Sequence, residues 1–284
     1  MMSHVNYGRR FKMLPGEGKL LVQTDIHGNY EDFCRLRDIF FQLLREAPAS
    51  HWVILGDVVH GPSRSAMEQN RALWGFEDES FRIVQEIRRF QEQYPEQIHF
   101  VLGNHEHAHV GGPRTRKFHD DEASYLESKL TKTQRQILRQ FIEAALLCVA
   151  TPCGAFLVHG APGLVMEGRE EIDAICFDDA KNSRRERLIL KHFLRSYGQP
   201  RELAQLFLMS LNRFVEQRQN FVVHGHDADR AGFFVEGGNQ ICPTLFGAPR
   251  DKKRYLVLDL KTRYDSLDEL IDEGCLRYLY PESI

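Results

Sequence analysis

The stretch that decides the fold is Lys19-Leu20-Leu21-Val22-Gln23-Thr24-Asp25-Ile26-His27-Gly28-Asn29. Its first half is a short apolar run, which predicts a buried strand over residues 19–23. Its second half is a polar turn that holds an aspartate, a histidine and a glycine. Apolar residues then recur at helical spacing from Tyr30 to about Glu46, which predicts a helix. The stretch therefore predicts a strand, a polar turn and a helix in succession.

Four later strands end in a similar polar turn. They are predicted at 51–55, before Gly56-Asp57; at 97–102, before Gly103-Asn104-His105-Glu106; at 155–158, before His159-Gly160; and at 220–223, before His224-Gly225-His226. Helices are predicted over 81–94 and 121–147, and further helices, broken near Gly198-Gln199-Pro200, over 184–219. Short strands are predicted near 232–235, 240–242 and 255–260. Strands that alternate with helices and then follow one another closely indicate an α/β sandwich.

The chain shows no linker or internal repeat, so we expect a single domain over residues 1–284 with a short N-terminal arm at 1–17. The helical stretch at 165–219 forms either a cap that selects substrates or a layer that packs on the core, and the sequence does not decide between them. The 42% of apolar residues and 27% of charged residues are ordinary for a globular protein.

The charge and cysteine content exclude several classes of protein. A formal net charge of −3 gives no indication of a nucleic-acid partner or a membrane partner. No apolar run approaches the roughly 18 residues that span a bilayer, and Met1–Lys12 lacks the apolar core of a secretory signal. None of the six cysteines forms a CxxC pair, so we expect reduced thiols in a cytoplasmic protein.

The five turns share their chemistry as well as their position. Each carries Asp, Asn or His beside glycine at the end of a predicted strand, and such loops share one rim of an α/β sheet. These side chains, without cysteine, suit Mn²⁺, Fe or Zn²⁺. Two divalent ions roughly 3.5–4 Å apart would clamp a phosphoryl group and supply a hydroxide nucleophile at neutral pH. Asp57, in the second turn, fits the place of a carboxylate that bridges the two ions.

The order of these turns resembles the calcineurin-like metallophosphoesterase superfamily over residues from about 20 to 260. The sequence is most similar to its PPP-type serine/threonine phosphoprotein phosphatases and to symmetrical diadenosine tetraphosphate hydrolases. Three motifs carry this resemblance: Asp25-Ile26-His27-Gly28-Asn29, Gly103-Asn104-His105-Glu106 and Leu245-Phe246-Gly247-Ala248-Pro249. The resemblance implies an αββα sandwich of two mixed sheets flanked by helices, and a hydrolase that acts on phosphoric esters.

The resemblance also implies roles for individual residues. Seven side chains would hold two divalent ions. We expect Mn²⁺ first, with Fe, Zn²⁺, Ni²⁺ or Mg²⁺ as alternatives. The first ion would take Asp25, His27, Asp57 and His226, and the second would take Asp57, Asn104, His159 and His224. His105 would protonate the leaving oxygen or steady the transition state, and Glu106 would orient a ligand or His105. Asp57, His105 and Glu106 are thus the expected catalytic residues, and Asn104 is also an expected substrate contact.

We number the five polar turns as the first to fifth motifs in chain order, and the second of them departs from the family pattern. Phosphoprotein phosphatases continue it as Gly-Asp-x-x-Asp-Arg-Gly, whereas this chain has Gly56-Asp57-Val58-Val59-His60-Gly61-Pro62. Gly61 therefore replaces the arginine that, in the family, clasps the substrate phosphate. His60 itself, Arg64, Arg250 and Arg254 are the candidates to replace it. For His107 and His109, which extend the third motif, we expect solvated loop residues rather than extra ligands.

We therefore expect a metal-dependent phosphatase that hydrolyses phosphomonoesters, phosphoserine and phosphothreonine in proteins included, by attack of a bridging hydroxide on a dinuclear metal site. The alternative is a phosphodiesterase or a dinucleoside polyphosphate hydrolase. A diester carries less charge, so its binding depends less on the arginine that this chain lacks. A third reading, a scaffold without activity, is disfavoured by intact His105 and Asn104. The expected partner is a phosphoester in a phosphoprotein, a nucleotide or a small molecule, and the sequence sets no oligomeric state.

Overall fold

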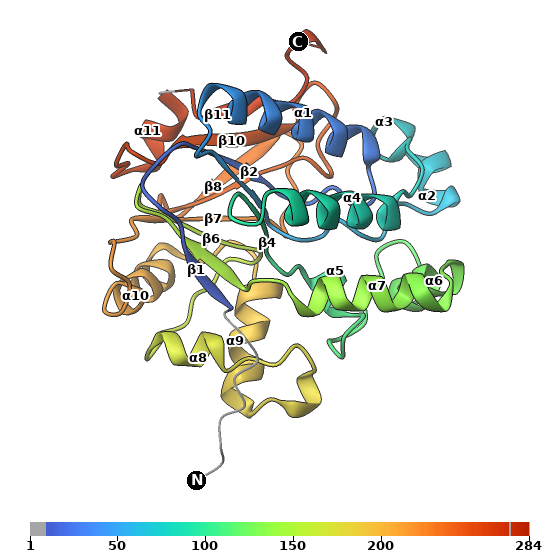
Figure 1. Ribbon diagram of the computed structural model, residues 1–284, viewed down its shortest axis with the longest axis horizontal. Coiled ribbons are helices and arrows are strands. Elements are labelled where there is room, and N and C mark those ends of the chain that lie inside the picture. Colours follow the sequence, from blue (N-terminus) through green and yellow to red (C-terminus); the bar gives the residue numbers. More distant parts are fainter. Residues whose placement is uncertain (1–9, 273, 284) are drawn as a thin grey trace.

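The computed structural model describes residues 10–272 and 274–283, and two mixed β-sheets form its centre (Figure 1). The five-stranded sheet has the order β11 (Leu276–Tyr278), β10 (Arg254–Asp259), β2 (Lys19–Gln23), β3 (His51–Ile54) and β4 (Ile98–Phe100). The six-stranded sheet has the order β1 (Phe11–Met13), β5 (Cys148–Ala150), β6 (Ala155–Val158), β7 (Phe221–His224), β9 (Gln240–Pro243) and β8 (Phe233–Glu236).

Helices cover the outer face of each sheet. On the five-stranded sheet, α1 (Tyr30–Glu46) packs on β2 and β3, and α4 (Ser80–Gln93) packs on β4. On the six-stranded sheet, Phe156 of β6 packs against Phe193 of α9 (Arg184–Arg195) and Phe207 of α10 (Arg201–Leu211). The other helices are α2 (Arg64–Gln69), α3 (Arg71–Trp74), α5 (Asn104–His107), α6 (Glu122–Lys129), α7 (Lys132–Glu143), α8 (Arg169–Asp173) and α11 (Leu267–Asp272). The predicted αββα sandwich is confirmed.

One buried cluster joins the two sheets face to face. It takes Val22 and Val53 from the five-stranded sheet and Leu157 and Val223 from the six-stranded sheet, all of them fully buried. Burial of such side chains is the main source of stability, at about 25 cal/mol per Å² of apolar surface. Because both sheets are fixed by this cluster, the carboxyl ends of their parallel strands are fixed relative to each other.

Helix boundaries follow from local capping. α1 begins where the Asn29 side chain accepts a hydrogen bond of 3.1 Å from the N–H of Asp32, so the first polar turn ends in an N-cap. The helix predicted over 121–147 is in fact two helices, α6 and α7, because Thr131 and Gln134 form a capping box that starts a new helix. The short strands β1, β5 and β11 and the short helices α2, α3 and α11 were not predicted.

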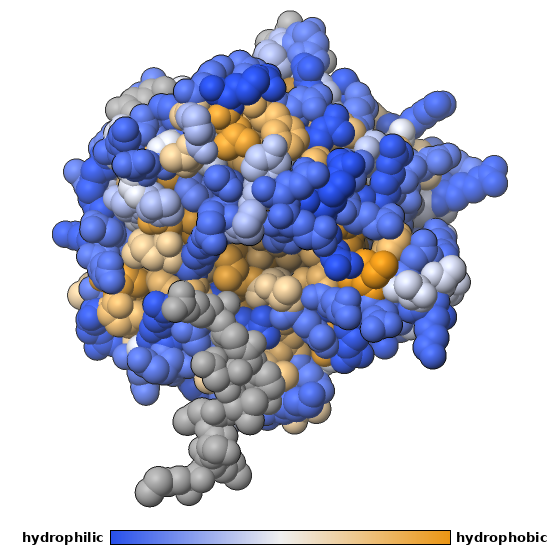
Figure 2. All heavy atoms as spheres, in the orientation of Figure 1, coloured by the Kyte–Doolittle hydropathy of each residue, from blue (hydrophilic) through white to orange (hydrophobic). Residues whose placement is uncertain are grey.

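The predicted N-terminal arm falls partly outside the described residues, since the structure describes the chain from residue 10 onward. Within the remainder of that arm, Phe11–Met13 forms β1 and pairs in parallel with β5. Hydrophilic residues cover most of the face shown in Figure 2, and apolar residues gather in a band across its middle. Among the described helices, none has both the length and the apolar content that crossing a bilayer requires.

Candidate dinuclear metal centre and active site

The five polar turns meet at one rim, as their places at strand ends predict. The carbonyl of Asp57 in the second turn accepts hydrogen bonds from the N–H groups of Ile26 (3.1 Å) and His27 (2.9 Å) in the first. The N–H of His226 in the fifth turn donates to Oδ2 of Asp25 at 3.0 Å. The N–H of Gly225 donates to the carbonyl of His159 at 2.8 Å. Backbone hydrogen bonds thus tie together turns that lie far apart in the sequence.

Strained backbone is concentrated at this rim. In the described part of the chain, four residues other than glycine have a positive φ: His27 (42°), Asp57 (48°), His60 (68°) and His226 (68°). Residues other than glycine rarely adopt this left-handed backbone conformation, because their Cβ crowds the neighbouring carbonyl. Three of the four are expected metal ligands, and the fourth follows one of them closely. Strain of this kind persists at functional sites, where surrounding structure enforces it.

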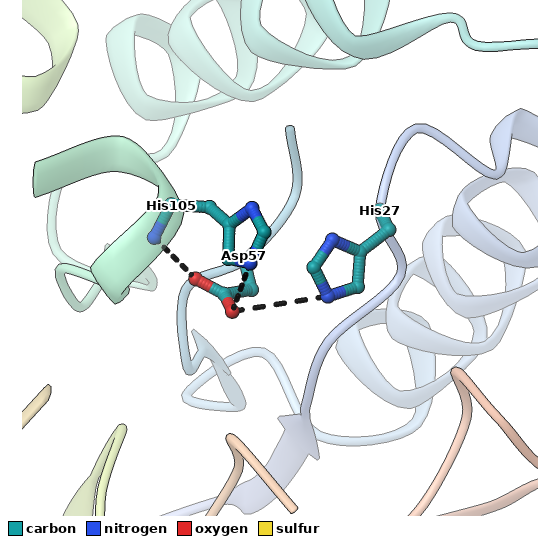
Figure 3. Close-up of side chains that lie close together, drawn as sticks. All are labelled: His27, Asp57 and His105. Carbon is teal, nitrogen blue, oxygen red and sulfur yellow. Dashed lines mark hydrogen bonds and ion pairs between the residues drawn. The ribbon is translucent and has the colours of Figure 1, made fainter. Parts of the chain in front are cut away.

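The carboxylate of Asp57 lies at the centre of the group (Figure 3). Its Oδ2 lies 3.8 Å from Nε2 of His27, 3.5 Å from Nε2 of His159 and 3.9 Å from Nε2 of His105. Its Oδ1 accepts a hydrogen bond of 2.9 Å from the N–H of His105. Three imidazoles from three different turns therefore surround one buried carboxylate, which is the arrangement expected of a bridging ligand.

Asn104 and the remaining histidines complete the donor set. Oδ1 of Asn104 lies 3.0 Å from Nε2 of His159 and 2.8 Å from Nδ1 of His226. Ligand atoms of Asp57, His159 and His226 lie within 4.8 Å of one another, so His226 lies with residues expected at the second ion. His224 is fully buried, and its Nε2 has no hydrogen-bond partner in the described structure.

The electrostatics of the site fit divalent cations. Burial raises the pKa of Asp57 well above its usual value, and the nearby Asp25 and Glu106 raise it further. Burial lowers the pKa of His226 to about 2 and that of His224 to about 4, so both imidazoles are neutral at pH 7. Buried carboxylates beside neutral imidazoles, one of them with an unpartnered nitrogen, are suitable ligands for such ions.

Glu106 holds the backbone of the second turn. It is fully buried (0% exposed), and its carboxylate accepts hydrogen bonds from the N–H groups of Asp57 (2.8 Å), Val58 (2.8 Å) and Val59 (3.2 Å). Burial raises its pKa, while the hydrogen bonds from Asp57 and Val58 oppose that rise. Glu106 therefore orients Asp57 through the peptide backbone.

A chain of three imidazoles extends from the site toward the surface, and we call His105, His60 and His109 the imidazole chain. Nδ1 of His105 lies 2.8 Å from Nδ1 of His60, whose Nε2 lies 2.9 Å from Nε2 of His109. His109 in turn donates from Nδ1 to Glu127 at 2.7 Å, a hydrogen bond that lowers the pKa of Glu127. The Glu127 carboxylate can only accept a hydrogen bond, and each neutral imidazole has a single N–H. His109 therefore donates to Glu127, His60 donates to His109, and His105 donates to His60. This leaves Nε2 of His105 without a proton.

The structure corrects the expectation that His107 and His109 are solvated, and it places His60 outside the cavity lining. His107 and His109 are buried, not solvated, because His107 contacts the carbonyl of Phe177 at 3.0 Å and His109 contacts Glu127. His60 is 2% exposed, within the imidazole chain, and it is not among the residues that line the cavity described below. The buried carboxylate of Glu122 lies 3.3 Å from Nδ1 of His105, a contact that no sequence motif indicated.

A cavity of about 440 Å³ opens onto the site. Its lining includes His27, Asp57, Asn104, His105 and His226. The rest of the lining is Arg114, Thr115, Arg116, Lys117, Arg195 and Tyr197, none of which was predicted as a site residue. The basic run 114–117 lies a few residues after Gly103-Asn104-His105-Glu106 and is visible in the sequence. Arg195 and Tyr197 gave no local signal, because the packing of α9 places them.

The arginines predicted to contact phosphate lie outside that lining. Arg64 on α2 has a side chain that is 93% exposed and pairs with Glu68 at 3.1 Å. Arg250 pairs with Glu31 at 2.8 Å and covers the ring of Tyr280. Arg254 similarly lies over a tyrosine ring. The structure thus brings Asn104 to the cavity but not Arg64, Arg250 or His60.

Comparison with known proteins gave a matching family model and similar solved structures. A family model described as calcineurin-like phosphoesterase matches residues 18–230, which is more than half of the chain. A serine/threonine phosphatase from Saccharomyces cerevisiae with similarity to human phosphatase PP5 has a similar structure, with a TM-score of 0.58 and 14% identity over 89% of this chain and 77% of that one. The cold-active protein-tyrosine phosphatase of a psychrophilic Shewanella species gives a TM-score of 0.52 and 15% identity over 89% and 78%. A search of curated proteins gave no match. At these identities the two structures show a shared fold.

Proposed function

This chain belongs to the calcineurin-like phosphoesterase family, and we propose that it is a metal-dependent phosphatase that hydrolyses phosphomonoesters at a dinuclear centre. Membership of the family makes it a phosphoric ester hydrolase that uses divalent metal ions. The observation that carries the proposal is the cavity, which brings Asp57, Asn104 and His105 together with a cationic wall. A phosphomonoester dianion is the ester of highest charge for its size, and a cationic wall favours it over a diester.

We propose that Asp25, His27 and Asp57 hold one ion and that Asp57, Asn104 and His159 hold the other, with His224 and His226 completing the two sets. Mn²⁺ is the first candidate for both positions. When bound, two such ions supply an activated water as nucleophile and neutralise charge on the phosphoryl oxygens. The unpartnered Nε2 of His224 supports its place among the ligands.

Three residues have further roles in the proposal. Glu106 keeps Asp57 in its strained conformation through the three backbone hydrogen bonds. His105 lines the cavity, and its Nε2 would take the proton that the attacking water gives up and pass it to the leaving oxygen. Its Nδ1 keeps its own proton, because His60 and Glu122 contact that nitrogen at 2.8 and 3.3 Å. The Glu122 carboxylate, with no hydrogen-bond partner for Oε2, stabilises the imidazolium that forms.

The experiment starts from protein stripped with a chelator and reloaded with Mn²⁺, Zn²⁺, Ni²⁺ or Mg²⁺ in parallel. Each form is assayed with p-nitrophenyl phosphate, a phosphothreonine peptide, bis-p-nitrophenyl phosphate and diadenosine tetraphosphate. We expect turnover of the two monoesters to exceed that of the other two substrates. Preference for the diester or for the dinucleotide would replace the proposed ester class by the alternative. An Asp57→Asn variant with full activity would refute the dinuclear site.

A further inference from the structure

The wall of the cavity carries four cationic side chains from two segments of the chain. Arg114, Arg116 and Lys117 come from one short loop after the third motif, and Arg195 comes from the last residue of α9. Nη2 of Arg195 donates a hydrogen bond of 3.0 Å to the carbonyl of Pro113, which ties α9 to that loop. The loop and the helix end therefore form one continuous cationic wall.

The four cationic side chains differ in whether a carboxylate pairs with them. Arg114 lies 3.6 Å from a carboxylate oxygen of Asp121 and is thereby paired. For Arg116, Lys117 and Arg195, the described residues provide no carboxylate oxygen within 4.0 Å. Three cations that share a cavity without a carboxylate partner repel one another, and an anion in the cavity removes that repulsion.

Lys117 lies close to one of the expected metal ligands, His27. Its Nζ lies 4.3 Å from the centre of the Phe246 ring, and that ring packs on His27 with centroids 4.0 Å apart. The side chain is accessible because it faces the cavity. Its ammonium is nevertheless crowded enough for desolvation to lower its pKa, an effect opposed by Asp25, Asp57 and Glu122. Its charge thus acts on the same carboxylates that surround the site.

Arg116 is the residue before Lys117 in the same loop. Its side chain is exposed and still lines the cavity, so its guanidinium is available to a group that projects from the site. A guanidinium binds carboxylate or phosphate oxygens through two parallel hydrogen bonds, whereas a lysine ammonium acts as a point charge. The two neighbouring residues are therefore suited to two different anionic groups of one ligand.

We propose that Lys117 binds the phosphate group that is removed and that Arg116 binds a second anionic group on the leaving portion of a small phosphoester substrate. This inference rests on the proposed phosphatase function and adds a substrate class to it: phosphomonoesters whose leaving group carries a carboxylate or a further phosphate.

The first experiment measures phosphate binding directly. Inorganic phosphate is titrated calorimetrically into the Mn²⁺-loaded wild type and into Lys117→Met, Lys117→Arg and Lys12→Met variants. Lys12 pairs with Glu96 on the surface at 3.2 Å and serves as the control. Loss of one hydrogen bond to a charged group predicts a Kd and a KM for p-nitrophenyl phosphate raised roughly 10- to 100-fold in Lys117→Met. Lys117→Arg should recover most of the affinity, and Lys12→Met should match the wild type.

The second experiment tests the second anionic group. Glycerol 3-phosphate and 3-phosphoglycerate differ only in a carboxylate that replaces a hydroxymethyl group, so phosphate release from the two isolates its contribution. We expect the wild type to prefer 3-phosphoglycerate in kcat/KM. Arg116→Gln should lose that preference, because its kcat/KM should fall further for 3-phosphoglycerate than for glycerol 3-phosphate.

The outcomes separate this inference from the function on which it rests. If Lys117→Met binds phosphate as tightly as the wild type, Lys117 is not a phosphate ligand. If Arg116→Gln leaves the substrate preference unchanged, or slows both substrates equally, the second contact is wrong. In either case a wild type that still hydrolyses p-nitrophenyl phosphate leaves the phosphatase proposal standing. A wild type that is inactive on every phosphoester refutes the phosphatase proposal itself.

Discussion

Replacing Glu106 with glutamine removes a negative charge from a fully buried site and changes the volume little. In the wild type, Oε1 accepts from the N–H groups of Val58 and Val59, and Oε2 accepts from the N–H of Asp57. The amide oxygen of glutamine can keep the first pair. Its NH₂ group must then face the N–H of Asp57, which places two donors opposite each other and leaves a buried N–H without an acceptor.

The size of the effect follows from that geometry. A hydrogen bond to a charged group contributes about 1.5–3 kcal/mol, and an orphaned buried donor costs about 1–3 kcal/mol, two figures that describe the same loss in part. The removed charge also relieves repulsion, since Glu106 is one of the carboxylates that raise the pKa of Asp57. We therefore expect Glu106→Gln to lower the free energy of unfolding of the metal-loaded protein by about 3 kcal/mol. The decrease should be smaller in the metal-free protein, because there no cation offsets the repulsion that the substitution removes.

The assay combines unfolding with metal binding. Urea unfolding with and without Mn²⁺ gives the two stability changes, and thermal unfolding should show a fall in Tm of about 6–12 °C for the loaded protein. Because the second turn loses the hydrogen bond that holds Asp57, we also expect affinity for Mn²⁺ to fall about 10- to 100-fold. Glu92→Gln, at an exposed position of α4, is the matched control.

Two results would refute this reasoning. Unchanged stability in Glu106→Gln would mean that the three backbone hydrogen bonds do not hold the turn. A large loss of stability with unchanged affinity for Mn²⁺ would mean that the turn does not control the position of Asp57. An equal loss in Glu92→Gln would show that the change reflects acidic residues in general.

Three further predictions concern other parts of the structure. Gly103→Ala should cost at least about tenfold in Mn²⁺ affinity and in kcat/KM, because a Cβ there would lie 2.3 Å from Oδ1 of Asp57; wild-type values from metal titration and kinetics would contradict it. Asp32→Ala should lower the free energy of unfolding in urea by about 3–5 kcal/mol, since it leaves the buried Lys253 ammonium without its ion pair, and a loss below about 1 kcal/mol would show that the pair is dispensable. His109→Phe should lower kcat about tenfold at constant KM for p-nitrophenyl phosphate, because it removes the acceptor that orients the imidazole chain, and a change in KM alone would place that chain in substrate binding.

The parts of the fold that were predicted are those whose signal is contiguous in the sequence. β2 and α1 match their predicted ranges, because an apolar run and a helical period each lie within one segment. The three-residue strands β1 and β11 carry too few residues for any period to show. The helix predicted over 121–147 was too long, because apolar spacing continues across a capping box that interrupts the hydrogen bonds.

The candidate site divides in the same way. The expected ligands could be named because each lies in a turn that ends a strand and contains a glycine, and hydrogen bonds between the turns bring them to one rim. Glu122 and Arg195 could not be placed from the sequence, since no motif surrounds them and tertiary packing alone brings them to His105 or to the cavity. Lys117 belongs to a basic run that is visible in the sequence, but its place in the cavity follows from the fold. Arg64 was a candidate because it lies just downstream of Gly61 in the sequence, but its side chain on α2 is exposed to solvent.

The altered second motif and the cationic wall have a common steric explanation. A Cβ on Gly61 would lie 2.7 Å from Cβ of Asp78 and 2.9 Å from its Cα, so the neighbouring segment closes the space that a side chain at this position needs. That segment is fixed, because Asp78 forms a β-bridge with Asn29 at the start of α1. An arginine at position 61 would have to displace backbone next to the first turn. A phosphate-binding cation must therefore come from another side of the cavity, where the described structure places three cations without a carboxylate partner: Arg116, Lys117 and Arg195. This agrees with the proposal that Lys117 and Arg116, from the loop after the third motif, bind the anionic groups of the substrate.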